Sequence, residues 1–425
     1  MSYDSTKLTM ATVGQASSLA SPLVDMGRPE AWPTWNESNG AGPDERLIAH
    51  PTIGVGGRAR LRVRRVAVAG LGNVGSRVAA ALATAGIPLV AIDSGVVEPA
   101  NVGWQLYTEQ HVGSRKCDAT RRQIAAVRPE LPVQCVYADV RRLGPRVLDR
   151  CDLVVGCVDS YSARVWLAQT CTLLRLPYVD LALDGTGQSL YGVVRGFDTA
   201  AGSACLACSW DAENWDALQQ EQGDSGCAAL VAAAQATPPT LALPGLGDIV
   251  AGLGVVQIVR VMLDADAQRV IGREIRLNLS IGRLHEVSLA ANQRCRLRHR
   301  PWDATRLDVR PDELTVGQLL QLATDRLGRD VALEAYADPM VGAAACIGCR
   351  RSDCSPRLRS RLGSCSGCGE LLVPLIETVR SRFERSDFPA AIDRTWADLG
   401  LPRGGAVAAH SADDEHVFLF AVGDS

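Results

Sequence analysis

Apolar and polar positions follow one another in blocks that predict an alternation of buried strands and helices. Residues 66–69 form a short, wholly apolar run, which is typical of a strand buried on both faces of a sheet. A glycine-rich turn, an apolar helix and a second apolar run that ends at Asp93 come next. This order predicts a βαβ unit of the kind that binds a mononucleotide.

The turn after this first strand has the composition of a phosphate-binding loop. Glycines allow the backbone to turn tightly and to approach a phosphate closely, and the helix that opens near Val74 presents free N–H groups to it. Asp93 lies where a carboxylate can accept hydrogen bonds from both ribose hydroxyls. The pattern alone does not distinguish ATP from a dinucleotide, so an NAD-dependent oxidoreductase is one alternative. The candidate phosphate-binding residues are Gly70, Gly72, Asn73 and Gly75.

Later blocks extend the same architecture. Residues 152–159 predict another buried strand, and a helix is expected over 163–174. The longest apolar region, 227–263, is interrupted by prolines and by Asp248, so it predicts a loop and a buried helix instead of a membrane span. The expected fold class is α/β with a mostly parallel sheet. Further strands are expected over 178–183, 275–279 and 284–289.

Composition narrows the class of protein. With 425 residues and 47% hydrophobic content the chain can bury roughly two or three domain cores, and its formal net charge of −3 gives no whole-chain bias toward nucleic acid. The amino terminus lacks a basic start followed by an apolar core, so a cytoplasmic protein is expected. In a long chain without a secretion signal, 14 cysteines are better explained by metal sites than by disulfides. The cysteines expected in the core are Cys117, Cys135, Cys151, Cys157 and Cys171.

The stretch beyond Asp93 carries a more specific signal. At fixed spacing after it stand Glu98, Asn101, Gln105, Gly113 and Lys116. This run resembles the D-x-x-x-V-E-x-x-N-x-x-R-Q…G-x-x-K sequence of the ThiF/MoeB/HesA adenylating family, which includes ubiquitin-activating enzymes. The family's next element, a buried strand that ends in an aspartate with a small polar residue and an arginine after it, is similar to Asp159, Ser160 and Arg164. The resemblance covers residues 45–299.

The resemblance implies an ATP-dependent adenylyltransferase that activates the terminal carboxylate of a ubiquitin-like or sulfur-carrier protein. An acyl oxygen would attack the α-phosphorus while magnesium pyrophosphate leaves, so fixed cations and Mg²⁺ must meet the developing charge. Lys116 matches the family's α-phosphate cation, and Asp159 matches its Mg²⁺ ligand. Asn101, Gln105 and Ser160 match nucleotide-binding positions.

Two further residues correspond to mobile or shared parts of the family's site. Alignment of the segment before the first strand places Arg46 at an arginine that usually reaches the active site of the other subunit of a homodimer. Cys227 stands at the place of a crossover-loop cysteine that forms a thioester or persulfide in some members. A thiolate is the soft nucleophile that such a transfer requires. A cysteine that only packs as a small apolar residue is the alternative.

The chain departs from the family at two positions. Trp104 stands where the family has the arginine before Gln105, and Gly95 replaces a second acid after Asp93. Loss of a triphosphate-binding arginine removes a cation that tryptophan cannot replace. A non-catalytic, nucleotide-binding scaffold that binds a ubiquitin-like protein is therefore an alternative to the enzyme. An oxidoreductase would leave the lysine, the second aspartate and the cysteine pairs unexplained.

Cysteine spacing predicts two structural zinc sites. Cys205 and Cys208 form a C-x-x-C pair, which together with Cys295 and His299 offers the ligands of a closed tetrahedral site. A second set has the C-x₂-C-x₁₅-C-x₂-C spacing that is typical of a zinc ribbon. Its members are Cys346, Cys349, Cys365 and Cys368.

Shifts in composition divide the chain into three parts. Residues 1–44 are expected to form a flexible extension, 45–300 the ATP-binding domain with a crossover loop over 223–247, and 301–425 a small α+β domain. The small domain is expected to contain a helix over 314–327, the ribbon over 345–370 and a β-hairpin over 399–422.

Arginines between the ribbon's cysteine pairs give this element a positive face. Because no aromatic residues are interleaved with them, an acidic protein partner or plain solvation is favoured over nucleic acid. We hypothesise that the ribbon docks the modifier protein or a ubiquitin-conjugating-type enzyme.

Overall fold

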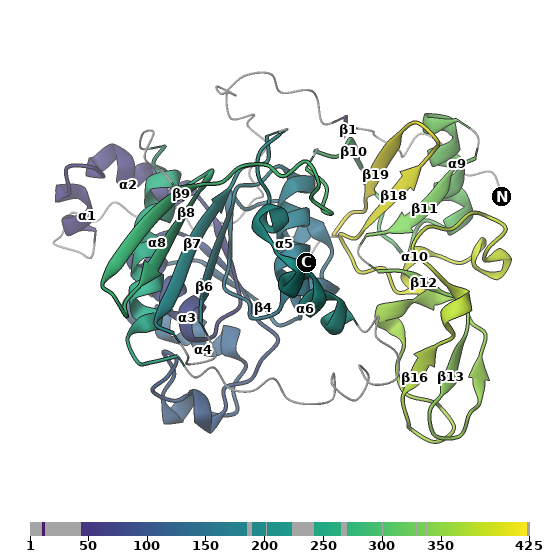
Figure 1. Cartoon of the computed structure of the whole chain (residues 1–425), viewed down its shortest axis with the longest axis horizontal. Coiled ribbons are helices and arrows are strands. Elements are labelled where there is room, and N and C mark those ends of the chain that lie inside the picture. Colours follow the sequence, from purple (N-terminus) through teal and green to yellow (C-terminus); the bar gives the residue numbers. More distant parts are fainter. Residues whose placement is uncertain are drawn as a thin grey trace.

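The computed structural model describes residues 11–12, 44–184, 189–200, 202–222, 242–264, 270–299, 301–328, 330–336 and 338–422. Two bodies lie next to each other (Figure 1). The larger is built on an eight-stranded sheet, and the smaller on a five-stranded sheet from which a cysteine-rich ribbon extends.

The eight-stranded sheet follows the apolar runs of the sequence. Its strand order is β4-β3-β2-β5-β6-β7-β8-β9. Pairing is parallel from β4 to β6 and antiparallel from β6 to β9, so the expected mostly parallel α/β sheet is confirmed. The strands are β2 (Val66–Ala69), β3 (Leu89–Ile92), β4 (Val133–Val136), β5 (Leu153–Gly156), β6 (Tyr178–Leu183), β7 (Tyr191–Phe197), β8 (Arg273–Asn278) and β9 (Arg283–Ser288).

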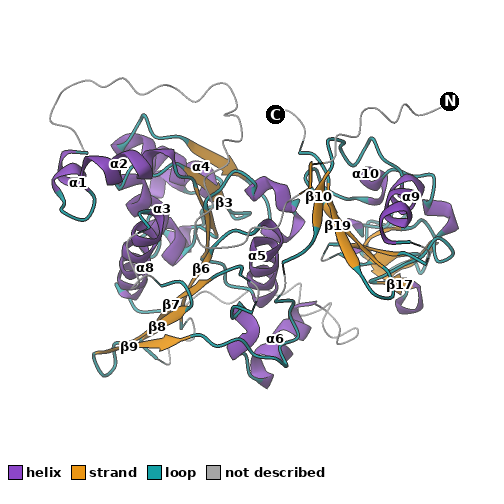
Figure 2. Ribbon diagram, turned by 90° about the horizontal axis from the view of Figure 1, so that it is seen from above, coloured by secondary structure: helices purple, strands orange, loops and turns teal. Residues whose placement is uncertain are grey.

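Helices cover both faces of this sheet (Figure 2). On one face lie α3 (Asn73–Thr84), α4 (Lys116–Val127) and α8 (Leu246–Met262), and on the other lie α5 (Tyr161–Leu174) and α6 (Ala212–Gln222). Alternate side chains of a strand point to opposite faces, so Val66 and Val68 join one core while Ala67 and Ala69 join the other. This two-sided burial explains why the central strands are uninterrupted apolar runs.

The helix expected after the crossover loop is α8, and it is buried on one side only. Val250 and Ile258 pack into the core, whereas Ile249 and Val256 are 44% and 56% exposed. The expected buried helix is thus present, but its burial is one-sided. A helix that is apolar on all sides does not reveal which side lacks a partner. Among the described residues, none of the helices combines the length and the apolar content that a membrane span needs.

Parts of the amino-terminal region contact the folded body. α1 (Glu45–Ala49) and α2 (Gly54–Val63) precede the first core strand. Asp44 pairs with the buried Arg58 and Arg128 at 2.6 and 2.7 Å, and although burial acts to raise the pKa of Asp44, these hydrogen bonds hold it below its usual value. β1 (Ala11–Thr12) pairs antiparallel with β10 (Ala304–Arg306). The rest of the expected extension lies outside the described residues.

The smaller body contains the expected helix and hairpin. Its sheet has the order β1-β10-β19-β18-β11, in which β10 and β19 are parallel and β18 is antiparallel to both of its neighbours. α9 (Val316–Leu327) begins with a capping box, in which the Thr315 hydroxyl accepts a hydrogen bond from the Gln318 N–H at 3.2 Å. The other elements are β11 (Ala332–Ala335), α10 (Trp396–Leu399), β18 (Ala406–His410) and β19 (Glu415–Leu419).

The ribbon and its base are two small three-stranded sheets. The ribbon has the order β14-β13-β16, and its base has the order β15-β12-β17. Their strands are β12 (Met340–Val341), β13 (Ala344–Cys346), β14 (Ser352–Asp353), β15 (Arg357–Leu358), β16 (Leu372–Pro374) and β17 (Val379–Arg380).

The two bodies are joined by apolar and polar contacts. Leu173 of α5 packs in one buried cluster with Ala304, Ala406 and Val417 of the smaller sheet. Next to it, the Arg146 guanidinium donates hydrogen bonds to the carbonyl groups of Leu307 and Phe420 at 3.2 and 3.3 Å. The smaller body is thus seated on α5, on the side of the sheet opposite α8 (Figure 2).

Candidate functional site

A cavity of about 1150 Å³ opens at the carboxyl ends of the central strands. Residues that directly follow β2, β3 and β5 line it, together with the end of β6. Open α/β sheets bind ligands at this edge, where the crossover connections change direction. The sequence-predicted nucleotide residues on its wall are Gly70, Gly72, Asn73, Asp93, Asn101, Gln105, Lys116, Asp159 and Ser160.

The glycine turn brings backbone to the cavity. Gly70 has a φ of +84°, and a Cβ there would lie 2.6 Å from the carbonyl oxygen of Cys157. A Cβ on Gly75 would overlap the carbonyl oxygen of Gly70, so Gly75 keeps α3 close to β2 although it does not line the cavity itself. α3 begins directly after Gly72, and its first residue, Asn73, is on the cavity wall. The positive end of the helix is therefore next to the space in which the phosphates are expected.

Asp93 follows β3 and is oriented by backbone donors. Its Oδ2 accepts a hydrogen bond from the Leu71 N–H and its Oδ1 accepts one from the Gly95 N–H, both at 2.6 Å. Each carboxylate oxygen has a second lone pair, so Asp93 can still accept hydrogen bonds from two hydroxyls. Its assignment to the ribose stays a prediction.

Lys116 is the first residue of α4 and lies beside Asp93. Its backbone N–H donates to the carbonyl oxygen of Gly95 at 3.0 Å. A Cβ on Gly95 would lie 2.9 Å from Asp93 Oδ1 and 3.3 Å from Cδ and Cε of Lys116. Glycine at this position therefore leaves room for the lysine side chain and the carboxylate to lie next to each other.

Asp159 lies in the loop between β5 and α5, where it is exposed on the cavity wall. The next residue, Ser160, caps α5, because its hydroxyl accepts a hydrogen bond from the Ala163 N–H at 3.3 Å. Arg164 supports the loop from behind, since its Nη2 donates to the carbonyl oxygen of Val158 at 2.5 Å. The loop that presents Asp159 is thus held at both ends.

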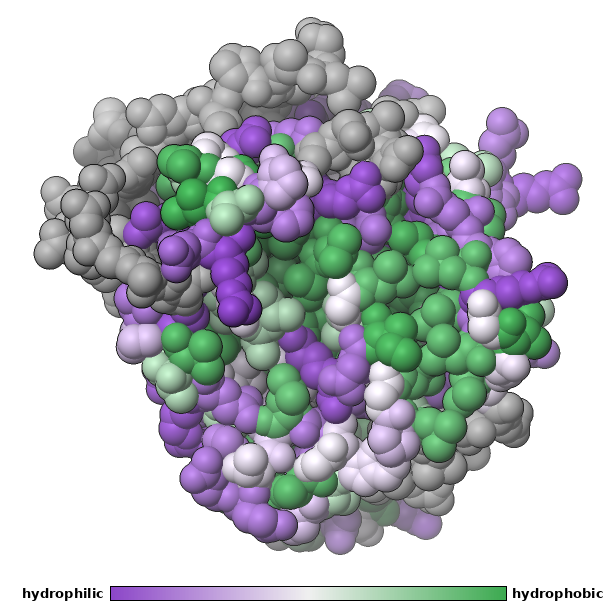
Figure 3. Space-filling view, turned by 90° about the vertical axis from the view of Figure 1, so that its left-hand side faces the viewer, coloured by the Kyte–Doolittle hydropathy of each residue, from purple (hydrophilic) through white to green (hydrophobic). Residues whose placement is uncertain are grey.

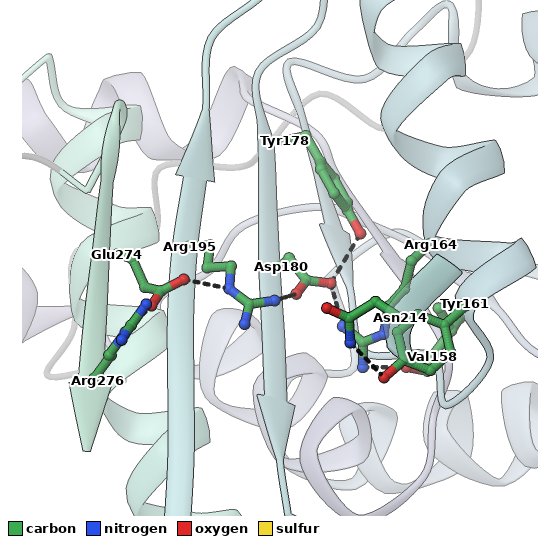
Figure 4. Close-up of polar contacts among 9 residues, drawn as sticks. All are labelled: Val158, Tyr161, Arg164, Tyr178, Asp180, Arg195, Asn214, Glu274 and Arg276. Atoms are coloured by element: carbon green, nitrogen blue, oxygen red, sulfur yellow. Dashed lines mark hydrogen bonds and ion pairs between the residues drawn. The ribbon is translucent and has the colours of Figure 1, made fainter. Parts of the chain in front are cut away.

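A row of charges crosses the sheet behind this loop (Figure 4). Asp180 of β6 is completely buried, pairs with Arg164 and Arg195, and accepts a hydrogen bond from the Tyr178 hydroxyl at 3.0 Å. Arg195 of β7 continues the row to Glu274 of β8, with its Nε 2.6 Å from the carboxylate. Burial, and then the charge of Asp180, raise the pKa of Tyr178 well above its usual value, so this hydroxyl remains a donor.

Trp104, at the position of the family's arginine, is 48% exposed and lines the cavity. Its backbone carbonyl accepts a hydrogen bond from Arg77 Nη1 at 3.1 Å. Arg77 is also bound to Asn73 Oδ1 at 2.8 Å and to Asp248 at 2.7 Å, and it is not among the residues that line the cavity. Arg77 therefore does not supply the missing cation.

Asn101 and Gln105 stabilise the turn that carries Trp104. Asn101 Oδ1 accepts a hydrogen bond from the Glu98 N–H at 3.0 Å, and the Asn101 carbonyl oxygen accepts one from the Gln105 N–H at 2.9 Å. The Oε1 atom of Gln105 is buried and has no hydrogen-bond partner among the described residues. A buried acceptor of this kind on a cavity wall is suited to a donor on a ligand.

The remaining predicted catalytic residues, Arg46 and Cys227, are not among the described residues of the cavity wall. Arg46 lies on α1, is exposed, and is not among the residues that line the cavity. Cys227 lies outside the described residues. Of the five cysteines expected in the core, Cys135 and Cys157 are only half-buried, and Cys157 lies on the cavity wall because it follows β5 directly.

The sequence interpretation missed a pair of charged residues that line the cavity. Asp139 and Arg141 follow β4 and line the cavity, and Arg141 donates to the Ser162 hydroxyl at 2.8 Å. Glu221 of α6 binds the amino end of α5, accepting hydrogen bonds from the N–H groups of Tyr161 and Ser162 at 2.8 Å each. The signal for Asp139 and Arg141 was available, because β4 ends at the same edge of the sheet as the other parallel strands.

The first cysteine cluster has the dimensions of a tetrahedral zinc site. Ligand atoms of Cys205, Cys208, Cys295 and His299 all lie within 4.8 Å of one another. Cys205 Sγ is 3.6 Å from Cys295 Sγ and 3.9 Å from Cys208 Sγ, close to the roughly 3.8 Å expected between sulfurs that share a zinc ion. Nδ1 of His299 is 3.1 Å from the carbonyl oxygen of Ser203, which leaves Nε2 free to act as the ligand.

The ribbon cluster also has the dimensions of a tetrahedral zinc site. Cys346 and Cys368 have their sulfur atoms 3.3 Å apart, and those of Cys349 and Cys365 are 3.6 Å apart. The four ligand atoms again lie within 4.8 Å of one another. Both four-residue sets predicted from spacing are therefore brought together, and their residues fit zinc.

Comparison with known proteins places the larger body in a family. The family model described as "ThiF family" matches residues 45–297. Adenylyltransferase and sulfurtransferase MOCS3 of Drosophila grimshawi is 27% identical over 214 residues, which cover 49% of this chain and 47% of the relative. Protein HesA of Trichormus variabilis is 24% identical over 191 residues, 43% of this chain and 70% of the relative. The chain spans about half the length of the MOCS3 relatives that it matches.

Solved structures give a partial likeness in addition. E. coli MccB in complex with AMPCPP and MccA has a TM-score of 0.46 and 18% identity, covering 57% of this chain and 70% of the other. E. coli MccB with ATP has a TM-score of 0.45 and 18% identity, covering 56% and 68%. The match to the family model spans more than half of the present sequence and contains the whole cavity wall. The chain therefore belongs to the ThiF family.

Proposed function

We propose that this protein is an ATP-dependent adenylyltransferase that activates the terminal carboxylate of a ubiquitin-like or sulfur-carrier protein. The observation that carries the proposal is that one cavity brings together the glycine turn, Asp93, Lys116 and Asp159. Membership of the ThiF family and the relatives named adenylyltransferase and sulfurtransferase support it. A cytoplasmic location, where ATP is available, belongs to the same proposal.

The proposed reaction needs groups that the cavity wall provides. A carboxylate oxygen of the carrier attacks the α-phosphorus of ATP, the bond from this phosphorus to the bridging oxygen breaks, and pyrophosphate leaves. The ammonium group of Lys116 compensates the negative charge on the α-phosphate, and Asp93 holds the ribose. Asp159 would hold Mg²⁺, which neutralises charge on the phosphates when it is bound.

The later fate of the activated carboxylate depends on Cys227. In this proposal its thiolate accepts the acyl group from the adenylate, with AMP as the leaving group, and forms a thioester. Glu221 docks the carboxyl-terminal part of α6 on the amino end of α5, only a few residues before this cysteine in the sequence. With a sulfur carrier, the alternative form of Cys227 is a persulfide, whose outer sulfur is transferred from a sulfane-sulfur donor.

Zinc has a structural role in the proposal. Both cysteine clusters offer four protein ligands, and a closed set of four ligands leaves no position for a substrate. The ribbon is also the proposed docking site for the modifier protein or for a ubiquitin-conjugating-type enzyme. Ile347 and Leu371 give it an exposed apolar tip, next to the exposed Arg350 and Arg351.

A homodimer accounts for the apolar face of the larger body. α2, α8 and β9 lie on the left of Figure 1, and the same side, seen face-on in Figure 3, has a broad hydrophobic area. An area of this kind is typical of a protein interface. α1, which carries Arg46, lies at this side too, so a partner subunit could receive this arginine. Exposed apolar residues of α2, α8 and β9 are Val55, Val63, Ile249, Val256, Leu284 and Val287.

An isotope experiment tests the proposed reaction directly. Candidate carrier proteins with a flexible glycine-rich tail are labelled with ¹⁸O in the terminal carboxylate and incubated with ATP and Mg²⁺. Attack on the α-phosphorus transfers one labelled oxygen to AMP when the adenylate is resolved by a thiol, and mass spectrometry of the AMP detects it. The same carrier ending in a carboxamide is the control and should give no AMP.

The scaffold alternative makes the opposite prediction. It keeps ATP binding and carrier binding but yields neither AMP nor pyrophosphate with any cognate carrier. Trp104 is the observation that favours it, because the family's arginine is missing there. A nicotinamide cofactor that changes its fluorescence on binding would instead support the oxidoreductase reading.

A further inference from the structure

The missing arginine at Trp104 raises the question of which cation faces the triphosphate. Transfer at the α-phosphorus develops negative charge on a ligand that is already highly charged, so more than one fixed cation is expected. The cationic side chains on the described wall are Lys116, Arg141 and Arg164. The question is which of these can act beside Lys116.

Arg164 is already committed to the protein. Its side chain is 13% exposed and is held by the buried Asp180 and by the carbonyl oxygen of Val158 (Figure 4). Asp180 is completely buried on β6, and its carboxylate compensates the charge of this guanidinium. Arg164 therefore positions the loop with Asp159 and has no charge to spare for a ligand.

Arg141 is more exposed than Arg164, and different residues hold its guanidinium in place. It belongs to a short 3-10 helix, η4 (Val140–Arg142), that follows β4, and its side chain is 43% exposed. Asp139 fixes it, accepting from Arg141 Nε at 3.0 Å and from Nη2 at 2.5 Å. Nη1 donates to the Ser162 hydroxyl at 2.8 Å, which ties the guanidinium to the first turn of α5. The planar group is thus held in one orientation at the cavity wall.

The contacts with Asp139 and Ser162 do not use all the hydrogen-bond donors of the Arg141 guanidinium. A guanidinium has five N–H bonds, and the contacts with Asp139 and Ser162 use one on each nitrogen. Among the described residues, one N–H on Nη1 and one on Nη2 remain without an acceptor. Hydrogen bonds with Asp139 raise the pKa of Arg141, and the charges of Glu221 and Asp159 act in the same direction. The Arg141 guanidinium is therefore pre-oriented and charged, and it lines the same cavity as the proposed Mg²⁺ ligand.

We propose that Arg141, which lines the same cavity as Trp104, binds the triphosphate of ATP and supplies the cation that the family's arginine supplies elsewhere. This inference rests on the proposed function. In the complex, the free N–H groups on Nη1 and Nη2 of Arg141 donate to phosphate oxygens, while Asp139 and Ser162 keep the guanidinium in place. No covalent bond to Arg141 forms or breaks.

Binding measurements with nucleotides of different charge test the proposal. Dissociation constants for ATP, AMP and adenosine are measured by calorimetry in the presence of Mg²⁺ for the wild type, Arg141→Ala and Arg142→Ala. Loss of charge-assisted hydrogen bonds should weaken ATP binding about 10- to 100-fold in Arg141→Ala, with adenosine unchanged. Arg142 is the matched control, because it is the exposed neighbour on η4 and does not line the cavity.

Two further variants separate a ligand contact from a structural role. Arg141→Gln keeps amide donors for Asp139 and Ser162 but loses the charge, and it should show the same selective loss for ATP. Trp104→Arg, introduced into Arg141→Ala, should recover most of the lost ATP affinity by restoring the family's cation. Trp104→Arg alone should raise the ATP affinity of the wild type by much less, because one such cation is already in place. An equal gain in both backgrounds would overturn the proposal, because the two positions would then act independently.

The outcomes distinguish the two levels of the proposal. If the wild type binds adenosine, AMP and ATP with equal affinity, or binds none of them, the proposed function fails and this inference fails with it. If the wild type prefers ATP and Arg141→Ala matches Arg142→Ala, only the role of Arg141 is overturned. Equal losses for ATP and adenosine would also overturn it, because they would indicate stacking on the base or local misfolding.

Discussion

At the residue scale, single buried charges decide how the site is held. Asp180 is fully buried, and the loop that presents Asp159 depends on its partner Arg164. The sequence identified Arg164 through its spacing after Asp159. Sequence alone did not identify Asp180 as part of this network. Its partners Arg164 and Arg195 lie on other elements, and only the folded sheet places them next to it.

Arg164→Met should destabilise the protein strongly. Removal of one partner leaves the Asp180 carboxylate with incomplete compensation in a buried position, which typically costs about 3–5 kcal/mol. The free energy of unfolding in urea measures the effect. The double variant Arg164→Met, Asp180→Asn should be clearly more stable than Arg164→Met alone, because the unpaired charge is gone. Equal stability of the two variants would contradict a direct charge interaction.

His416 gives the smaller body a pH-dependent stability. It is buried on β19, and its Nε2 lies 2.8 Å from the Thr305 hydroxyl. Burial, and then the charge of Arg326, lower the pKa of His416 from 6.5 to about 4. Between these values the unfolded chain binds a proton that the folded chain does not. The free energy of unfolding that neutral His416 contributes above pH 6.5 is therefore lost as the pH falls toward 4. The loss amounts to at most about 3 kcal/mol.

The measurement is thermal unfolding followed between pH 7 and pH 4, at constant ionic strength. His416→Asn, which cannot take up a proton in this range, should flatten the curve for the transition that reports the smaller body. His285→Asn is the control, because His285 is exposed on the edge strand β9. A wild-type curve that is no steeper than that of His416→Asn would show that His416 is not responsible.

At the element scale, the sequence predicted those strands and helices that are buried on both faces or whose apolar residues recur at a regular spacing. β2 and β6 begin and end where predicted. The predicted hairpin β18–β19 is present as well, although its strands are buried at consecutive residues instead of at alternating ones. The outer side of α8 was not predictable, because its apolar residues do not show whether a partner covers them. Likewise, the pairing of β1 with β10 depends on segments almost 300 residues apart in sequence, for which a two-residue strand carries no signal.

The two cysteine clusters should each bind one zinc ion. The purified chain should contain about two equivalents of zinc, because both sets offer four ligands at tetrahedral spacing. Cys349→Ser removes one ribbon ligand and should lower the content to about one equivalent. Cys354→Ser is the matched control, since Cys354 is exposed and belongs to neither cluster. Metal analysis that finds equal zinc in both variants would exclude the ribbon as a site.

At the scale of the whole molecule, the proposed homodimer would let two chains complete each site. The family motifs predicted the cavity of one chain, because they lie on strands that end at one edge. They could not place Arg46, which lies on the apolar side of the larger body and is absent from the cavity of its own chain. Only the arrangement of a second copy decides whether it reaches an active site.

Mixing of inactive variants tests this arrangement. Homodimers of Arg46→Ala and of Lys116→Ala should each be unable to exchange labelled pyrophosphate into ATP. After subunits are mixed and allowed to re-associate, half of the dimers contain one chain of each kind, with one complete site, so about a quarter of the wild-type activity should return. Activity that stays absent after verified subunit exchange would show that Arg46 acts within its own chain or has no role.

Isotope exchange between pyrophosphate and ATP tests the central claim most directly. Labelled pyrophosphate is supplied with ATP, Mg²⁺ and candidate carriers that end in a flexible glycine-rich tail, and incorporation of label into ATP is measured. The account predicts carrier-dependent exchange in the wild type and in the control Arg122→Ala, an exposed position on α4. In Lys116→Ala and Asp159→Ala, exchange should fall by about 100-fold or more. ATP binding without exchange for every cognate carrier would contradict the account and favour a nucleotide-binding scaffold.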